Sequence, residues 1–265
     1  MKKALFLLLV IPALGFYTDD PANVLNGVYR QTKYRHGTMT GLKVRDDMTA
    51  LKLFVNGHWV SVLYNHKDPA KTGSVGGGTY HLKNGKYLET TGFYSWNPTV
   101  VGQTIKYDYS LKNGVYYQRG MVRGTEKHHD YLSEEYAERI KAEKPLTATN
   151  LEGVWLHLYS EYSDHSMHMR DQPGTITLQY MMYPHFVSVT YGSKENEVLE
   201  YFGGTYEFDG QRLKQTIDFA NGDFYEVGQI LNYTITLHDN AFTQEQSRWR
   251  ELFVSAEPHM MAMKK

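Results

Sequence analysis

The segment His58-Trp-Val-Ser-Val-Leu-Tyr64 recurs 127 positions later as His185-Phe-Val-Ser-Val-Thr-Tyr191. Working outward from it, Gly77-Gly-Thr-Tyr80 recurs as Gly203-Gly-Thr-Tyr206 at nearly the same offset. Chance similarity does not keep such a register between distant segments. The sequence therefore predicts two tandem copies of one domain.

The outer matches set the limits of the two copies. Leu25-Asn-Gly-Val-Tyr29 recurs as Leu151-Glu-Gly-Val-Trp155, so we place the copies at 25–127 and 150–254 and a flexible tail at 255–265.

The segment between the copies, residues 128–149, predicts a short linker helix. Ser133 precedes Glu134 and Glu135, as an N-cap followed by acids in the first helical turn would. Pro145 stops the helix.

Residues 1–15 have the layout of a secretory signal peptide. Lys2 and Lys3 precede the apolar run 5–10, and Ala13-Leu14-Gly15 offers small residues for cleavage. An uncleaved membrane anchor is the alternative. No cysteine follows the run, so no lipid attachment is expected, and no later apolar run approaches the length of a membrane span. We expect a secreted or periplasmic protein without an integral span in the mature chain.

The composition excludes several classes of function. Among 265 residues, 28 Lys and Arg face 29 Asp and Glu, which argues against a nucleic-acid partner. The absence of cysteine excludes disulfides, thiolate metal sites and thiol catalysis. The 22 tyrosines favour β structure.

Regular turn signals predict the architecture of each copy. Asn56-Gly57 is a strong hairpin signal between two apolar runs, and Lys83-Asn84-Gly85 and Lys112-Asn113-Gly114 follow at similar spacing. Such spacing is typical of a meander that closes on itself. We predict an all-β chain with two antiparallel barrels of about eight strands each.

A two-residue period sorts the strand faces. One face of 58–64 is identical in both copies, and we predict that it points into the barrel with His58 and Tyr64, matched by His185 and Tyr191. The same reasoning predicts interior positions for Leu51, Leu53, Val55, Leu178, Tyr180, Met182, Ile105, Tyr107, Tyr109, Leu111, Leu231, Tyr233, Ile235 and Leu237. An inward histidine either orients a ligand or forms a satisfied part of the core.

The second copy resembles the lipocalin family. Gly153-Val-Trp155 opens it and Arg248-Trp-Arg250 lies near its end, as the Gly-x-Trp and closing arginine do in lipocalins. The first copy departs with Tyr29, and Arg119 or Arg123 is its candidate closing residue. Together the copies resemble tandem lipocalin-like, calycin-type domains of exported bacterial proteins of unassigned function. The resemblance implies barrels closed by Tyr29, Trp155, Arg248 and Arg250, and it carries over no catalytic residue.

Motifs for common enzyme chemistry are absent. The sequence has no nucleophile elbow, phosphate loop, zinc-protease motif or dinucleotide fingerprint. Glu89 and Asp108 align with Lys214 and Thr234, so no carboxylate pair is repeated. We expect no cofactor.

Met and His gather at 165–169, 181–185 and 259–263. Thioether and imidazole ligands suit Cu(I), which makes copper handling a further alternative to methionines that simply fill the core.

Three hypotheses follow. The first is a non-enzymatic binding protein for a small apolar or amphipathic ligand, with His58, Tyr64, Tyr107, Tyr109, His185, Tyr191 and Tyr233 as candidate ligand-binding residues. The second is a barrel-interior isomerase or hydrolase that uses His58 or His185 as its acid–base group. The third is an interaction module with solid barrels. The sequence does not indicate the oligomeric state.

Overall fold

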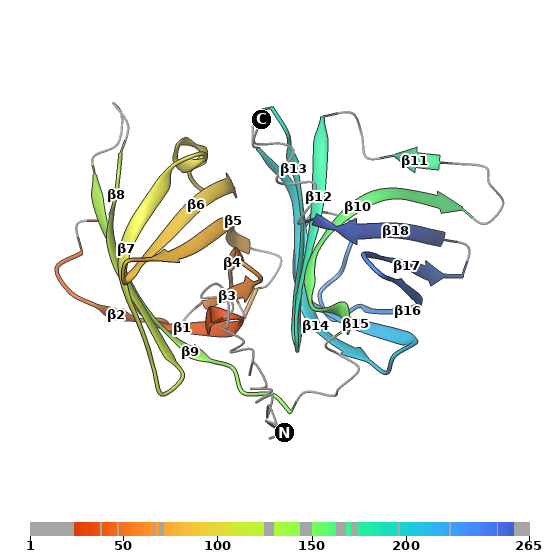
Figure 1. Cartoon of the computed structure of the whole chain (residues 1–265), viewed down its shortest axis with the longest axis horizontal. Helices are drawn as coiled ribbons and strands as arrows, with labels where there is room; N and C mark the ends of the chain where they lie inside the picture. The colour runs from red at the N-terminus through yellow and green to blue at the C-terminus, as the bar shows by residue number, and fades with distance from the viewer. Residues whose placement is uncertain are drawn as a thin grey trace, which may run out of the picture.

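The computed structural model shows a chain built almost entirely of β-strands, arranged as two barrels side by side (Figure 1). It describes residues 24–37, 39–46, 48–65, 67–68, 72–124, 130–143, 150–162, 168–170, 174–194, 197–222, 224–247 and 249–256. The predicted signal segment at 1–15 and all but the first two residues of the predicted tail lie outside these ranges.

The first barrel closes when its first strand pairs with its last. The sheet order is β2-β1-β3-β4-β5-β6-β7-β8-β9 with an additional β1–β9 pairing, so eight strands form the wall and the short β2 lies beside β1. The strands are β1 (Gly27–Gly37), β2 (Lys43–Val44), β3 (Thr49–Val55), β4 (His58–Tyr64), β5 (Thr72–Lys83), β6 (Lys86–Tyr94), β7 (Thr104–Lys112), β8 (Val115–Val122) and β9 (Tyr131–Arg139).

The second barrel repeats this topology, with the order β11-β10-β12-β13-β14-β15-β16-β17-β18 and closure through β10–β18. The predicted all-β fold with two antiparallel barrels is therefore confirmed. The strands are β10 (Gly153–Tyr162), β11 (His168–Arg170), β12 (Thr175–Met182), β13 (His185–Gly192), β14 (Val198–Phe208), β15 (Arg212–Asn221), β16 (Ile230–His238), β17 (Ala241–Gln246) and β18 (Trp249–Ser255).

The predicted linker helix is wrong, because residues 131–139 of this segment form β9, the strand that closes the first barrel. The acids that suggested a helix N-terminus have basic partners on β1. Arg35 forms an ion pair with Glu134, and His36 Nε2 lies 3.1 Å from Glu135 Oε1. These partners are about a hundred residues away in sequence, so strand pairing overrides the local helix signal.

The repeated glycines allow close packing at a β-bulge. The register of β5 against β6 shifts between Gly77 and Gly78, and that of β14 against β15 shifts between Gly203 and Gly204. A Cβ atom on Gly77 would lie 2.4 Å from the Phe93 ring. A side chain at this position would therefore displace the aromatic ring that packs across it.

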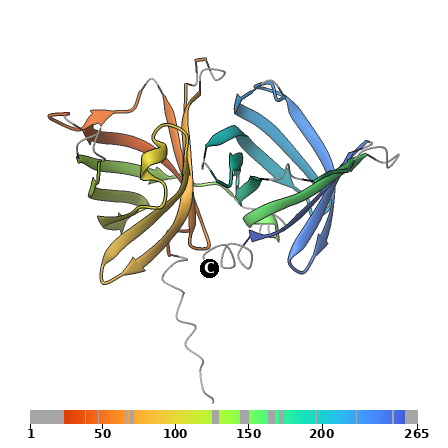
Figure 2. The same cartoon turned by 90° about the horizontal axis from the view of Figure 1, so that it is seen from above.

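The two barrels share one hydrophobic core, which lies between them (Figures 1 and 2). The Tyr64 ring stacks on Phe219 with centroids 4.8 Å apart, and Phe93 stacks on Tyr191 at 5.0 Å. Tyr64 matches Tyr191, and Phe93 matches Phe219 because they face Gly77 and Gly203 across the bulges. The contact is thus reciprocal, as in an isologous dimer interface.

This shared core corrects the predicted orientation of two strands, β3 and β4, and of their counterparts β12 and β13. The repeated face of β4 and β13 packs on the other barrel, and the opposite face, with Trp59 and Phe186, points into the barrels. The residues predicted as interior that lie instead between the barrels are Leu51, Leu53, Val55, Val60, Val62, Tyr64, Leu178, Tyr180, Met182, Val187, Val189 and Tyr191. Identity on one face did mark a shared environment, but that environment is the contact of one copy with the other.

Candidate functional site

The two histidines predicted to reach a ligand lie outside the barrel interiors. His58 and His185 are both buried on the strand face that carries the inter-barrel valines. His58 Nδ1 lies 3.1 Å from the carbonyl oxygen of Asn56. Burial lowers the pKa of His185 to about 4, and the charge of Arg30 from the first barrel acts in the same direction.

Three predicted tyrosines do face the interiors. Tyr107 is buried in the first barrel and Tyr109 is half-buried against the same core. Tyr233 lies in the core of the second barrel and lines a cavity there. Ligand binding by these tyrosines remains a prediction.

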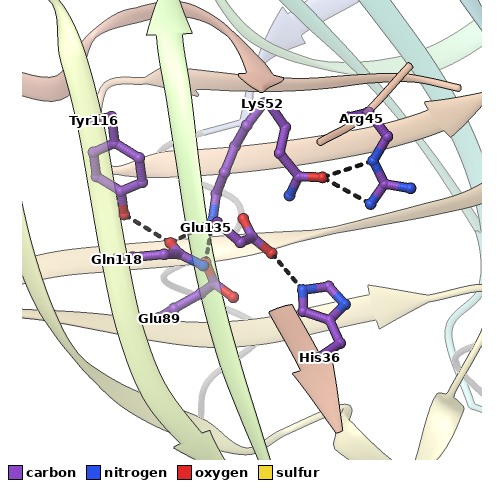
Figure 3. A network of polar contacts seen from close by, with 8 residues as sticks. His36, Arg45, Lys52, Glu89, Tyr116, Gln118 and Glu135 are labelled. Carbon is purple, nitrogen blue, oxygen red and sulfur yellow. Dashed lines mark hydrogen bonds and ion pairs between the residues drawn. The ribbon is translucent and has the colours of Figure 1, made fainter. Parts of the chain in front are cut away.

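The middle of the first barrel holds a buried ion pair (Figure 3). Lys52 Nζ lies 2.5 Å from Glu89 Oε2 and donates a second hydrogen bond of 3.2 Å to Gln118 Oε1. Tyr87 donates its hydroxyl hydrogen to Glu89 at 2.6 Å, and Tyr116 donates to Gln118 at 2.8 Å. Every member of this Lys52 network is buried, so each charge is compensated by groups of the same barrel.

Aromatic rings complete the surroundings of the lysine. Its ammonium lies 4.7 Å from the Trp59 ring, 5.2 Å from Tyr87 and 5.3 Å from Phe54. A ring face attracts a cation at these distances. With the network in place, only about 80 Å³ remains open in this interior, which is far below the size of an ordinary ligand pocket.

Glu135 adds a second carboxylate, besides that of Glu89, to the wall of the first barrel. Burial disfavours its ionised form, but the hydrogen bond and charge of His36, assisted by the charge of Lys52, outweigh burial and lower the pKa of Glu135 to about 2. Glu135 is therefore a carboxylate across the whole physiological range.

The strand register identifies the matching positions in the second barrel. Lys52 is the cross-strand neighbour of Ser61, and Gln179 holds the same position beside Ser188, so Lys52 matches Gln179. Glu89 is the cross-strand neighbour of Tyr80, and Gln215 holds the same position beside Tyr206, so Glu89 matches Gln215. By the same reasoning Gln118 matches Gln244 and Glu135 matches Glu251. Glu89 thus aligns with Gln215, not with Lys214 as the sequence suggested. The Lys–Glu pair of the first barrel is a pair of glutamines in the second.

The second barrel also lacks the two hydroxyls that complete the network. Leu213 stands where the first barrel has Tyr87, and Phe242 stands where it has Tyr116. As a result, Gln215 Nε2 and Gln244 Oε1 are buried without a hydrogen-bond partner among the described residues. Buried polar atoms in native proteins are almost always satisfied, and these two amide atoms are among nine such atoms of the described residues that have no partner.

Both glutamines line a cavity of about 350 Å³, within the size range of small-molecule sites. Phe202 and Tyr225 stack at its wall with centroids 3.9 Å apart. The remaining lining residues are His157, Ser160, Thr175, Thr177, Gln179, Ser188, Thr190, Leu199, Glu200, Tyr233, Glu251 and Phe253. Among the described residues, the lining holds two acids and no Lys or Arg.

One corner of the cavity has residue types found in catalytic triads. Ser160 Oγ lies 2.9 Å from His157 Nε2, and Glu251 Oε1 lies 3.6 Å from the same nitrogen. A triad needs the acid on the other ring nitrogen, where it orients the imidazole toward the nucleophile. These groups therefore form a polar wall rather than an activated serine.

The predicted closure by an arginine over an aromatic ring occurs in the first barrel. Arg139 from β9 lies with its guanidinium 5.7 Å from the Tyr29 ring centre, so Arg139 takes the place predicted for Arg119 or Arg123. In the second barrel Ser255 faces Trp155, and the indole N–H donates instead to the Leu151 carbonyl at 2.9 Å.

Arg250, one of the two closing residues predicted for the second barrel, is not at that position. Arg250 is partly exposed and forms an ion pair of 3.1 Å with Glu245, away from Trp155. Arg248 lies outside the described residues.

The described residues contain no group of three or more His, Asp or Glu that would hold a metal ion. Met181 and Met182 point to opposite faces of β12, one into the second barrel and one into the inter-barrel core. The segment 259–263 and most of 165–169 lie outside the described residues. Copper handling therefore stays a prediction from sequence.

Within the described part of the chain, no helix has the length and apolar character needed to cross a membrane.

Comparison with known proteins reveals similarity of fold without similarity of sequence. No family model and no curated protein matches the chain. A solved structure of an uncharacterized protein from Saccharomyces cerevisiae is similar with a TM-score of 0.50 and 8% identity, over 86% of this chain and 98% of that one. A protein of unknown function from the DUF3598 family of Nostoc punctiforme aligns over 88% and 96% of the two chains, with 11% identity and a TM-score of 0.27. The likeness to the yeast protein shows the fold alone.

Proposed function

We propose that this protein is a non-enzymatic, lipocalin-like binding protein that holds a small amphipathic molecule inside its second barrel. The signal-like segment at 1–15 supports an exported location, secreted or periplasmic, as part of the same proposal. The first barrel acts as a solid partner domain in this account, because the Lys52 network fills its interior.

One observation carries the proposal. Gln215 and Gln244, only 2% and 4% exposed, line a cavity of about 350 Å³, and each has one buried polar atom without a hydrogen-bond partner among the described residues. Leaving a buried polar group without a partner costs about 1–3 kcal/mol. A ligand with complementary donors and acceptors would recover that free energy, and the Phe202–Tyr225 stack would contact its apolar part.

The histidine-based enzyme is not proposed, because His58 and His185 lie on the strand face that carries the inter-barrel valines and neither lines the cavity.

Native mass spectrometry of the protein purified from its own cells tests the proposal, together with thermal shifts against a chemically varied panel of small molecules. We expect a bound mass or a stabilising compound, and we expect Gln215→Leu to remove it. The control is Gln118→Leu in the first barrel, which disturbs the Lys52 network but leaves the second cavity intact. A wild-type protein that neither carries nor gains any small molecule would overturn the proposal, and so would full retention of the ligand by Gln215→Leu.

A further inference from the structure

The first barrel shows how an interior of this design holds an ammonium group. Lys52 Nζ is bound by one carboxylate and one amide, and three aromatic rings surround it. In the second barrel the lysine position is Gln179, whose shorter side chain carries no charge. The barrel that lacks the lysine is the one with the larger cavity.

The charges around the second cavity favour a cation. Glu251 and Glu200 line it, and no Lys or Arg in the described part of the chain does. Glu251 accepts hydrogen bonds from Gln244 Nε2 and, at 3.5 Å, from Ser160 Oγ, and the basic partner that it has among the described residues is His157 at 3.6 Å. These contacts fix the carboxylate in the cavity wall and leave its charge without a permanent counter-ion among the described residues.

The negative charge of the cavity also affects the pKa values of two of its tyrosines, Tyr225 and Tyr233. Burial is the main cause of the raised pKa of Tyr225 and of Tyr233, and the charge of Glu251 raises both further. Glu200 adds to the effect on Tyr225. Both phenols therefore stay neutral, and their rings are available to a cation.

We propose that the ligand of the second barrel is a small organic amine, bound as its ammonium ion between Glu251 and the unpartnered Oε1 of Gln244, the counterpart of the Gln118 oxygen that accepts a hydrogen bond from Lys52 in the first barrel. This inference rests on the proposed binding function and names the class of ligand. The unpartnered Nε2 of Gln215 would donate to an acceptor group of the same molecule. The rings of Phe202, Tyr225 and Tyr233 would contact its apolar part.

Isothermal titration calorimetry at neutral pH with three probes of similar shape tests the inference: phenethylamine, 2-phenylethanol and 3-phenylpropionate. We expect the amine to bind at least about tenfold more tightly than the alcohol, because a hydrogen bond to a charged group is worth about 1.4 kcal/mol or more. We expect no detectable binding of the carboxylate. An alcohol that binds as tightly as the amine would overturn the inference.

Substitutions at equivalent positions of the two barrels show which barrel is responsible for the preference for the amine. Glu251→Gln should abolish the preference for the amine, whereas Glu135→Gln, its counterpart in the first barrel, should leave the affinity unchanged. The double variant Gln179→Lys/Gln215→Glu installs the first barrel's ion pair in the second, and it should keep the fold by circular dichroism and lose amine binding. Retention of amine binding by this variant, or of the preference by Glu251→Gln, contradicts the inference.

The proposed function can survive when this inference fails. A neutral or acidic molecule found bound by native mass spectrometry, with no amine binding, would support a binding protein and exclude an amine as its ligand.

Discussion

The Lys52–Glu89 pair provides a quantitative test of the account of the first barrel. The perturbation is a double-mutant cycle with Lys52→Gln, Glu89→Gln and both together, and the double variant creates the glutamine pair that the second barrel already has. The two side chains are 9% and 6% exposed. Removing one partner of such a buried pair leaves the other charge uncompensated, which typically costs about 3–5 kcal/mol.

The expected magnitudes follow from the contacts. In Lys52→Gln, Glu89 keeps only the hydroxyl of Tyr87; in Glu89→Gln, Lys52 keeps Gln118 and its rings. Each single variant should lose about 3 kcal/mol or more of stability. The double variant buries no charge at these positions, and it should lose clearly less than the sum, which gives a coupling free energy of at least about 2 kcal/mol.

Urea unfolding followed by tryptophan fluorescence measures this cycle, since Trp59 lies 4.7 Å from Lys52 Nζ. The exposed Lys86–Asp108 pair supplies the control, and Lys86→Gln should leave the unfolding midpoint almost unchanged. If the effects of the two single substitutions simply add, to within about 0.5 kcal/mol, the two groups do not interact and the reasoning about the Lys52 network is refuted.

Three further predictions concern the interface, the pH dependence and barrel closure. Phe219→Ala removes the ring stacked on Tyr64 and should cost about 3–5 kcal/mol; calorimetry should show the two barrels unfolding in separate steps, and a single unchanged transition would contradict the shared core. Because the folded-state pKa of His185 is about 4, below its ordinary value of 6.5, the unfolded chain binds more protons between these values, and stability should fall as pH drops through this window. His185→Gln should flatten that slope in thermal melts, and an identical slope would show that His185 is not responsible. Arg139→Met removes the cation beside Tyr29 and should lower stability by about 0.5–2 kcal/mol, whereas Arg119→Met should have little effect on the melting temperature.

The two barrels could be predicted from the sequence because the signals were local or repeated. Asn56 and Gly57 both adopt positive φ angles, as the predicted tight hairpin requires. The duplicated glycines mark a bulge in each copy. These features depend on residues close together in the chain, so no knowledge of tertiary contacts was needed.

The face of β3, β4, β12 and β13 that points into the barrel could not be predicted in this way. These strands are largely buried on both faces, since one face lines its own barrel and the other packs on the other barrel. A two-residue period separates the faces without showing which points inward. The position of Lys52 between Leu51 and Leu53 was the available sign that the leucines point away from the barrel interior. It can be interpreted only once Glu89 is known to pair with Lys52 inside the barrel.

The candidate site was missed for the same reason. Gln215, Gln244 and Glu251 are polar residues on three different strands, and the barrel brings them together around one cavity. Alignment of the two copies by sequence pairs Glu89 with Lys214, which is one residue away from its true counterpart Gln215. A shift of one residue exchanges the two faces of a strand, which concealed the conversion of an ion pair into two glutamines.

The most direct test of the central claim is a crystal structure of the protein with phenethylamine. We expect the amine in the second barrel, with its nitrogen within hydrogen-bond distance of Glu251 and Gln244, and no amine in the first barrel, where the Lys52 ammonium already lies beside Gln118. An amine bound in the first barrel or between the barrels, with the second cavity empty, would contradict the claim.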